Sequence, residues 1–407
     1  MLAGVFSPCP QSASQRFSSF AQVLRSRGYD VTVLTCSRCL KRGEKPLSHE
    51  EILVYDLKSP RFLISASFVF INPVILFLYF LMGLIIVAMR GADVVYSSIP
   101  GGETAVVGFF LSKIFKVPLI IDIRDMYPPP SDEMAYMHTP SKLNAVLLSL
   151  FKRLYRSSDK IVCVYEDIKQ RLLEFGVSPE KIVVITNGAD TSIYTPCSSG
   201  DRERIRLKYG LPLSKFIFVY AGALAWYYPV IDAIKGLKRT VSAKNKPQMV
   251  IISLANYASG KKVVKELGLE DSVTFMGPLS VADTAEILSV CDVGLVVYRG
   301  DDYWKNVYGS KVFSYMSCGL PVLASGPLDS LIERLLETHK AGLFIGRPDE
   351  KNFAKGFSFF LKNKSEAEIM GRNARKVADK LYDRRKLGLR LVSLIDELSE
   401  STNTSDS

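Results

Sequence analysis

Residues 16–35 have the sequence RFSSFAQVLRSRGYDVTVLT, and this stretch gives the first indication of the fold. Apolar side chains recur at helical spacing from Arg16 to Arg27, and Gly28 ends the pattern. The β-branched run Val31–Thr35 that follows is typical of a buried strand. Because Met1–Ser7 is a further short apolar run, the chain begins with a strand, a helix and a strand. This order predicts a doubly wound α/β domain.

The alternation of strands and helices continues along the chain and is interrupted once. Between Thr195 and Asp201 the composition shifts to Pro, Cys, Ser and Gly, as in a linker. We therefore predict an α/β chain with two Rossmann-like, doubly wound parallel-sheet domains, 1–196 and 197–383, that face each other across a cleft. Residues 384–398 are expected to form a helix that can pack back on the N-terminal domain, and 399–407 a disordered tail.

Bulk composition narrows the class of protein. A chain of 407 residues, of which 48% are hydrophobic, can bury two cores. The net charge of +11 favours an anionic partner, which could be a nucleotide phosphate or an anionic lipid. Nucleic acid is not expected, because neither zinc-finger spacing nor an RNA-binding aromatic signature is present. The seven cysteines and the isolated Cys36–Cys39 pair indicate reduced thiols in the cytoplasm, since no secretory signal is visible.

The stretch 62–89 contains no formally charged residue. Its length would permit a transmembrane helix, but the strands on either side look like members of one sheet. Three interpretations remain: a buried core helix, a single span, and a monotopic segment that dips into one leaflet. We favour the monotopic segment, because Asn72-Pro73 could divide the stretch into two shorter pieces and basic residues flank it. The expected location is the inner face of the cytoplasmic membrane.

Five segments match the motifs of one family in the correct order. They are DIRDMYP (122–128), ITNGAD (185–190), YAGAL (220–224), VTFMG (273–277) and GSKVFSYMSCGLPV (309–322). In these segments the chain resembles family 4 glycosyltransferases of the GT-B fold, in the branch that builds lipid-linked and surface polysaccharides. The resemblance covers nearly the whole chain. It implies sugar transfer from a nucleotide diphosphate sugar with retention of configuration and without an obligatory cofactor or metal.

The donor site is expected in the second domain. Gly222 and Ala223 follow a strand, where the backbone can approach a diphosphate closely; an ordinary tight turn is the alternative. Ser310 and Lys311 begin a helix, and Lys311 could neutralise the phosphates of the departing nucleotide unless it is only a surface lysine. Lys261 is a second candidate for the same work.

One departure from the family pattern concerns two glutamates that many members carry with E-x7-E spacing. The resemblance assigns the first to the donor sugar and the second to the ribose. The corresponding positions here are Asn306 and Ser314, which can form only neutral hydrogen bonds. Asp301 and Asp302 lie upstream and would fill the role only if the loop aligned differently.

The acceptor side is expected in the first domain. Arg124 and Asp125 end a strand, and Asp125 could orient or deprotonate an acceptor hydroxyl, although a helix cap or an internal salt bridge would also explain the pair. His138 lies in a segment that looks like an acceptor loop. Arg16 could bind an acceptor phosphate, or it could simply begin a helix.

Two rival functions remain open. A nucleotide-sugar epimerase can have the same fold, but the stretch 62–89 argues against it. A non-catalytic glycosyltransferase-like subunit on a membrane is the second rival, because Asn306 and Ser314 replace carboxylates. The expected partners of the enzyme are a nucleotide sugar, a lipid-linked acceptor and the membrane surface.

Overall fold

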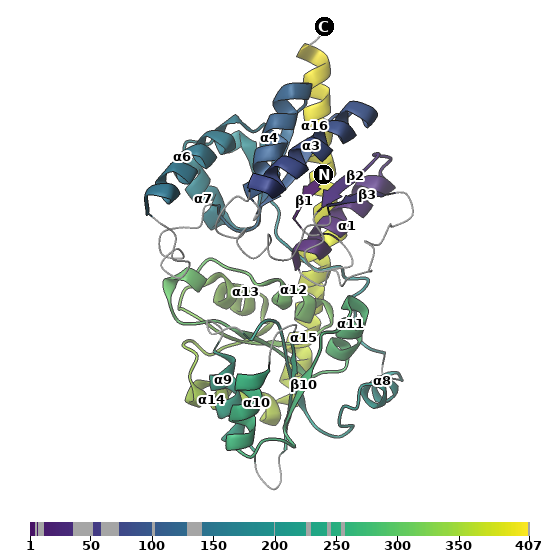
Figure 1. Cartoon of the computed structure of the whole chain (residues 1–407). Helices are drawn as coiled ribbons and strands as arrows, with labels where there is room; N and C mark the ends of the chain where they lie inside the picture. Colours follow the sequence, from purple (N-terminus) through teal and green to yellow (C-terminus); the bar gives the residue numbers. More distant parts are fainter. Residues whose placement is uncertain are drawn as a thin grey trace. The chain divides into compact units, whose positions relative to one another are not determined.

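The computed structural model describes residues 1–4, 6, 12–35, 52–57, 73–99, 102–127, 141–198, 200–224, 229–241, 246–253 and 257–405 (Figure 1). The chain forms two compact units. Unit 1 comprises Met1–Asn187 and Arg385–Ser407, and unit 2 comprises Gly188–Arg384. The boundary therefore lies before the Pro- and Ser-rich stretch at residues 195–201. Residues 188–194 belong to unit 2 because the Ala189 amide donates to the Tyr382 carbonyl at 3.0 Å.

Unit 1 contains a seven-stranded parallel sheet in the order β3-β2-β1-β4-β5-β6-β7. Its strands are β1 (Leu2–Ala3), β2 (Thr32–Thr35), β3 (Leu53–Asp56), β4 (Val95–Ile99), β5 (Leu119–Ile123), β6 (Lys160–Cys163) and β7 (Ile182–Val184). Strands β4 and β5 are buried along their whole length. Continuous apolar runs are what a parallel sheet covered on both faces requires.

The helices of unit 1 cover both faces of this sheet. They are α1 (Ser12–Ser26), α3 (Pro73–Arg90), α4 (Gly102–Phe115), α6 (Ser141–Ser157), α7 (Glu166–Glu174), the short 3₁₀ turn η1 (Pro179–Lys181) and α16 (Arg384–Ser405). Helices α3, α4, α6 and α7 contribute to one apolar cluster, whereas α1 and α16 contribute to another. The two clusters are the two faces of one sheet.

The last helix of the chain belongs to unit 1. Leu391 of α16 is fully buried in the same cluster as Phe17 and Phe20 of α1. Gly388 permits this packing, because a Cβ there would lie 3.0 Å from the side chain of Val23. The helix extends to Ser405, well past the point at residue 399 where the sequence analysis expects a tail.

Unit 2 repeats the plan with a six-stranded parallel sheet in the order β10-β9-β8-β11-β12-β13. Its strands are β8 (Ile217–Ala221), β9 (Gln248–Ile252), β10 (Val273–Met276), β11 (Val293–Val297), β12 (Val322–Ser325) and β13 (Gly342–Phe344). The edge position predicted for residues 342–345 is confirmed. Together, the two parallel sheets confirm the predicted α/β architecture with two Rossmann-like domains.

The helices of unit 2 also form two layers. They are α8 (Arg202–Lys208), α9 (Val230–Lys238), α10 (Ala258–Glu266), α11 (Val281–Ser289), the 3₁₀ turn η2 (Asp302–Trp304), α12 (Ser310–Ser317), α13 (Leu331–His339), α14 (Glu350–Lys362), α15 (Lys364–Val377) and the π-helical turn η3 (Ala378–Tyr382). Helices α14 and α15 are not anticipated by the sequence analysis. Phe353, Phe357 and Phe360 of α14 are fully buried, so this helix completes the core on one face of the sheet.

The apolar stretch 62–89 is described from residue 73 onward, where it forms the single helix α3. Pro73 is its first residue, a position that tolerates the missing amide hydrogen. By length and composition α3 is the one described helix that could cross a membrane, and 22% of it is buried. A crossing would separate β3 from β4, although both belong to one sheet. A core helix would be buried on most sides, which α3 is not.

Candidate functional site

The loop after β8 lies at the carboxyl edge of the sheet in unit 2. The Gly222 amide donates to the carbonyl of Ile252, the last residue of β9, at 2.9 Å. The carbonyl of Ala223 accepts the hydroxyl of Tyr220 at 2.7 Å, and Ala223 itself is exposed. These contacts fix a tight turn that begins with two small residues, at the edge where parallel α/β sheets bind ligands.

Lys311 of α12 lies directly against this turn. A Cβ placed on Gly222 would be 2.7 Å from the Lys311 Nζ, so a residue with a side chain would collide with the ammonium group. The same nitrogen lies 4.1 Å from the centroid of the Tyr220 ring. The structure therefore brings together Gly222, Ala223 and Lys311, which the sequence analysis assigned to the donor.

Two tyrosines hold the start of α12 in place. The Gly309 amide donates to the Tyr298 hydroxyl at 2.6 Å, and the Ala221 amide donates to the Tyr315 hydroxyl at 2.7 Å. Tyr315 can pack there because Gly294 of β11 has no side chain; a Cβ would lie 2.4 Å from the ring. Both bonds join α12 to the sheet, so the backbone geometry fixes the position of Lys311.

Burial controls the charge of Lys311. Its side chain is partly buried, and its terminal nitrogen is inaccessible to solvent. Loss of hydration disfavours the ammonium form and lowers the pKa of Lys311 to about 7. An anion beside the amino group would favour the charged form again, and the amides in the first turn of α12 would attract the same anion. The cluster is therefore suited to a phosphate group.

The remaining donor candidates lie on the same elements or near them. Ser314 is one helical turn from Ser310 and Lys311 on α12, and both serines are partly buried, as is Asn306. Lys261 of α10 is exposed, and its Nζ lies 5.7 Å from the centroid of the Tyr257 ring. The Tyr257 hydroxyl donates to the carbonyl of Ser253 just after β9, which brings Lys261 near the carboxyl edge of the sheet.

In unit 1, Arg124 and Asp125 directly follow β5 at the carboxyl edge of the sheet. The Arg124 amide donates to the Ile99 carbonyl at 3.1 Å, which extends the β4–β5 pairing by one step. Burial lowers the pKa of Arg124, and the neighbouring carboxylates Asp125 and Asp122 partly oppose this. The Arg124 Nε is buried, and no hydrogen-bond partner for it lies within the described part of the chain. Asp125 is exposed, so its carboxylate can meet a ligand.

Arg16 does not have the position that an acceptor ligand needs, and the expected phosphate-binding role is wrong. Its side chain is fully buried and forms a bidentate ion pair with Asp122, Nε–Oδ2 2.9 Å and Nη2–Oδ1 3.2 Å. The Nη1 donates to the Thr186 carbonyl at 2.6 Å, and the Tyr96 hydroxyl donates to Asp122 at 2.6 Å. Burial alone would lower the pKa of Arg16, but Asp122 outweighs it and the pKa is raised. Arg16 therefore anchors strand β5.

Some predictions cannot be placed. His138 and the proposed acceptor loop lie outside the described residues, as does the Cys36–Cys39 pair. Asp301 forms an ion pair with Arg299 at 3.1 Å and is exposed. Within the part of the chain that the structure describes, no group of three or more His, Cys, Asp or Glu side chains could hold a metal ion.

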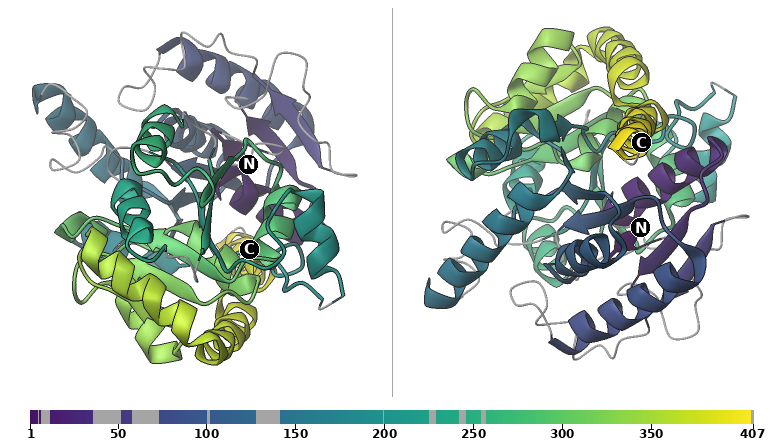
Figure 2. Two further views of the ribbon diagram at one scale, coloured as in Figure 1. Left: turned by 90° about the horizontal axis from the view of Figure 1, so that it is seen from below. Right: turned by 90° about the horizontal axis from the view of Figure 1, so that it is seen from above.

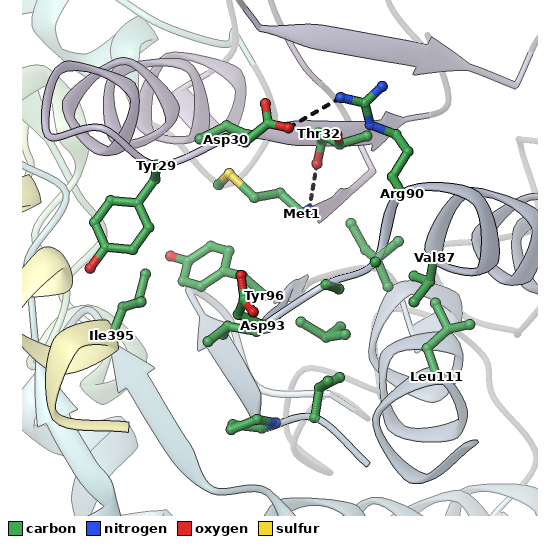
Figure 3. Close-up of a pocket in the computed structure, with 18 of the residues that line it drawn as sticks. Met1, Tyr29, Asp30, Thr32, Val87, Arg90, Asp93, Tyr96, Leu111 and Ile395 are labelled. Atoms are coloured by element: carbon green, nitrogen blue, oxygen red, sulfur yellow. Dashed lines mark hydrogen bonds and ion pairs between the residues drawn. The ribbon is translucent and has the colours of Figure 1, made fainter. Parts of the chain in front are cut away.

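A pocket of about 960 Å³ lies at the opposite, amino edge of the sheet in unit 1 (Figure 3). Met1 lines it, and the Met1 amino group donates to the carbonyl of Thr32, the first residue of β2, at 2.7 Å. An Arg90–Asp30 ion pair at 3.1 Å borders it. Because Arg124 and Asp125 lie at the other edge, this pocket is not part of the candidate site.

Sequence reasoning missed the tyrosines that build the site in unit 2. Tyr220 supports the amino group of Lys311, while Tyr298 and Tyr315 fix α12. One signal was present: Tyr220 stands two residues before Gly222 at the end of a buried strand, where a large aromatic side chain must face the ligand edge or the core.

Two family models cover most of the chain. The model described as Glycosyltransferase Family 4 matches residues 13–193, and the model described as Glycosyl transferases group 1 matches residues 201–377. The first match falls within unit 1 except at its end, and the second falls within unit 2.

The curated relatives have low sequence identity to this chain. A D-inositol 3-phosphate glycosyltransferase of Gordonia bronchialis is 26% identical over 235 residues, which is 54% of this chain and 49% of the relative. The protein of the same description from Mycobacterium tuberculosis is 24% identical over 202 residues, 46% of this chain and 39% of the relative. The chain thus spans about half the length of these relatives, or less.

Solved structures share the fold over nearly the whole length. HepE of Anabaena in complex with UDP and glucose has a TM-score of 0.73 at 18% identity, covering 97% of this chain and 99% of that one. The sucrose-phosphate synthase of Thermosynechococcus elongatus has a TM-score of 0.73 at 17% identity, with coverages of 95% and 93%. WaaG, described as a glycosyltransferase involved in lipopolysaccharide biosynthesis, has a TM-score of 0.70 at 16% identity, covering 97% and 98%. These likenesses show the GT-B fold.

Proposed function

The chain belongs to glycosyltransferase family 4, and on that premise we propose that it transfers a sugar from a nucleotide diphosphate sugar to a lipid-linked or surface-glycan acceptor. The observation that carries the proposal is the contact of Lys311 with the turn at Gly222. A diphosphate is the ligand that such a glycine turn, an amino group and a helix N-terminus would bind together. The UDP complexes of HepE support a donor of this class.

Lys311 would act when the bond between the sugar and the diphosphate of the donor is broken. The bond between the anomeric carbon and the diphosphate oxygen breaks, and the acceptor hydroxyl forms a new bond to that carbon on the same face. Negative charge grows on the leaving diphosphate, where Lys311 and the amides of α12 oppose it. The proton of the acceptor hydroxyl is lost during the same step, and Asp125 is the exposed carboxylate that we assign to orient the hydroxyl or accept its proton.

The remaining residues would hold the substrates. Asn306 and Ser314 would hydrogen-bond the donor sugar and the ribose, and Lys261 would supply further positive charge near the nucleotide. Arg124 would bind a polar or anionic part of the acceptor, since its buried Nε has no hydrogen-bond partner among the residues that the structure describes. The description of WaaG supports an acceptor of the lipid-linked class. We place the enzyme at the inner face of the cytoplasmic membrane, where helix α3 would contact the bilayer.

The test is a transfer assay with the full chain. Radiolabelled nucleotide sugars are incubated one by one with membrane lipid extracts, and label that moves into the organic phase is measured. We expect one donor to give a lipid-soluble product, which Lys311→Ala abolishes and Lys262→Ala retains. Lys262 is a matched control, because it is an exposed lysine of α10 that pairs with Glu266 of the same helix at 3.9 Å.

A second candidate function is a non-catalytic, nucleotide-binding subunit. The observation that favours it is the presence of an amide and a hydroxyl at 306 and 314, the positions that correspond to the two glutamates of the E-x7-E pattern. The transfer assay and a separate measurement of nucleotide-sugar binding together distinguish the two functions. Binding of a nucleotide sugar without transfer to any lipid fraction would overturn the transferase and favour the subunit.

A further inference from the structure

Large apolar side chains are exposed together on three helices of unit 1. Their exposed fractions range from 36% for Leu78 to 79% for Met89. They are Val74, Phe77, Leu78, Leu81, Ile85 and Met89 of α3, Phe110 and Ile114 of α4, and Val146 and Leu150 of α6. We call this set the outer face. Exposed apolar patches that span several elements mark interaction sites in soluble proteins.

The outer face is continuous across the helices. In Figures 1 and 2 α4 lies between α3 and α6, and α4 contacts both. The rings of Phe80 and Phe110 meet edge to face at 6.1 Å and join α3 to α4. All three helices cover the same side of the sheet in unit 1. A single flat partner could therefore touch them together.

The opposite side of α3 is fixed to the protein. Ile75, Tyr79, Gly83 and Ile86 are buried, and the Tyr79 hydroxyl donates to the Ala3 carbonyl of β1 at 2.9 Å. A Cβ on Gly83 would lie 2.8 Å from the Leu111 side chain of α4, so the two helices are closely packed. The exposed residues lie on another side and extend from 74 to 89, about 22 Å along the helix axis.

Charge on these helices has one sign. The only acidic residue of α3, α4 and α6 is Glu103, which is buried. Lys113, Lys116, Arg153 and Arg156 are exposed, and in the described part of the chain none of them has a carboxylate within 4.0 Å. An apolar surface with a basic border is complementary to an anionic bilayer leaflet, in which acyl chains lie beneath negative headgroups.

We propose that the outer face is a docking surface for an anionic lipid leaflet, with α3 lying in the plane of the membrane interface. A stripe along one side of α3 can enter the leaflet only if the helix axis is parallel to the surface. The inference deepens the proposed function by assigning the membrane contact to particular residues and to anionic lipid. A lipid-linked acceptor would then be collected from the leaflet on which the enzyme rests.

The test measures sedimentation of the full chain with vesicles of phosphatidylcholine alone or with 30% phosphatidylglycerol, without nucleotide sugar. We expect binding to the anionic vesicles and a loss of roughly tenfold or more in the partition coefficient for Phe77→Glu/Leu81→Glu. The matched control Leu207→Glu/Ile369→Glu changes two equally exposed apolar residues of unit 2 and should retain full binding. Lys113→Glu/Lys116→Glu should remove the preference for anionic lipid.

A second experiment measures how deeply α3 enters the lipid leaflet. Phe77→Trp should be quenched by lipids brominated near the headgroup end of the acyl chain, whereas Leu207→Trp should not. Unchanged sedimentation of Phe77→Glu/Leu81→Glu, or no quenching at residue 77, would overturn the proposal. So would a dimer in lipid-free solution that the same double variant dissociates, because a second copy would then cover the face. Nucleotide-sugar binding by the same variants reports on the donor site alone, so failure of docking and failure of the proposed function are distinguishable.

Discussion

Units 1 and 2 are built on the same plan, a parallel sheet covered by helices, but their outer helices differ in chemistry. Helix α3 of unit 1 has no charged residue before Arg90, and exposes Phe77 and Leu81. Helix α14 of unit 2 buries three of its four phenylalanines and exposes Lys351 and Lys355. The fold requires only that one stripe of each helix be apolar. The additional apolar surface of α3 is therefore not a requirement of folding, and this is why we propose the membrane contact on unit 1.

The two units also differ in the charged groups at the carboxyl edges of their sheets. In unit 1 the charged pair Arg16–Asp122 is buried beneath the edge and stabilises it. In unit 2 the amino group of Lys311 lies at this edge, and desolvation lowers its pKa to about 7. The ion pair of unit 1 holds the edge of the sheet in place. The amino group of unit 2 can instead take up a proton when an anionic ligand binds beside it. This difference is the reason why we propose the donor diphosphate site in unit 2.

The largest expected effect concerns the buried pair of unit 1. Asp122→Ala leaves the guanidinium of Arg16 buried without its carboxylate, and we expect a loss of about 3–5 kcal/mol in unfolding free energy. Chemical denaturation followed by far-UV circular dichroism measures it. Asp201→Ala breaks an exposed Asp201–Arg204 pair in unit 2 and should leave stability essentially unchanged. Equal losses in both variants would contradict the structural role of Arg16.

The next effect concerns Lys311 in unit 2. Lys311→Ala should weaken nucleotide-sugar binding by about 100-fold, or about 2.7 kcal/mol, because a charge-assisted contact to the diphosphate is lost. Isothermal titration calorimetry measures the affinity. Lys262→Ala should bind as the unchanged protein does. A Lys311→Ala variant with full affinity would remove the basis for placing the diphosphate here.

The pH dependence of binding should reflect the same amino group. A pKa near 7 in the free protein means that Lys311 loses its proton as the pH rises above 7, whereas a bound diphosphate favours the protonated form. The dissociation constant for a nucleotide sugar should therefore be constant below pH 7 and rise by up to tenfold per pH unit above it. Lys311→Arg remains charged and should show no such rise. A flat profile for the unchanged protein would contradict the assignment.

A smaller effect is expected at the glycine turn. Gly222→Ala brings a methyl group to within 2.7 Å of the Lys311 Nζ and 3.2 Å of the Tyr220 hydroxyl, at a φ of 158° that L side chains rarely adopt. We expect the amino group to shift and nucleotide-sugar affinity to fall by about tenfold. Gly200→Ala is the control, because a Cβ at Gly200 would meet no atom within 4 Å. Thermal unfolding of both variants checks that the fold is intact.

Local sequence patterns predicted much of this architecture. Glycines that end helices, β-branched strands and the linker composition indicated two parallel α/β domains, and the motif at 309–322 indicated Lys311. They failed where the deciding contact was distant in sequence. Arg16 looked like a phosphate ligand, because its partner Asp122 is 106 residues away. Helix α14 was missed because its apolar side chains can be recognised as core residues only when the sheet that they cover is known.

The surface of α3 was only partly predictable. The absence of charge in the stretch was plain from the sequence, but which side chains face the protein was not. Gly83 and Tyr79 turn inward because Leu111 and the Ala3 carbonyl meet them there. Tyr298 and Tyr315 were missed for a similar reason, since their hydroxyls bind backbone amides of other elements.

Hydrogen–deuterium exchange most directly tests the claim that unit 2 binds the nucleotide sugar and unit 1 contacts the membrane. The full chain is compared in three states: alone, with the nucleotide sugar that binds, and with anionic vesicles. The account predicts slower exchange at 222–224 and 309–314 with the nucleotide sugar, and slower exchange in α3, α4 and α6 with vesicles. Vesicle protection spread over the helices of unit 2, or unchanged exchange at 222–224 and 309–314 with bound nucleotide sugar, would contradict it.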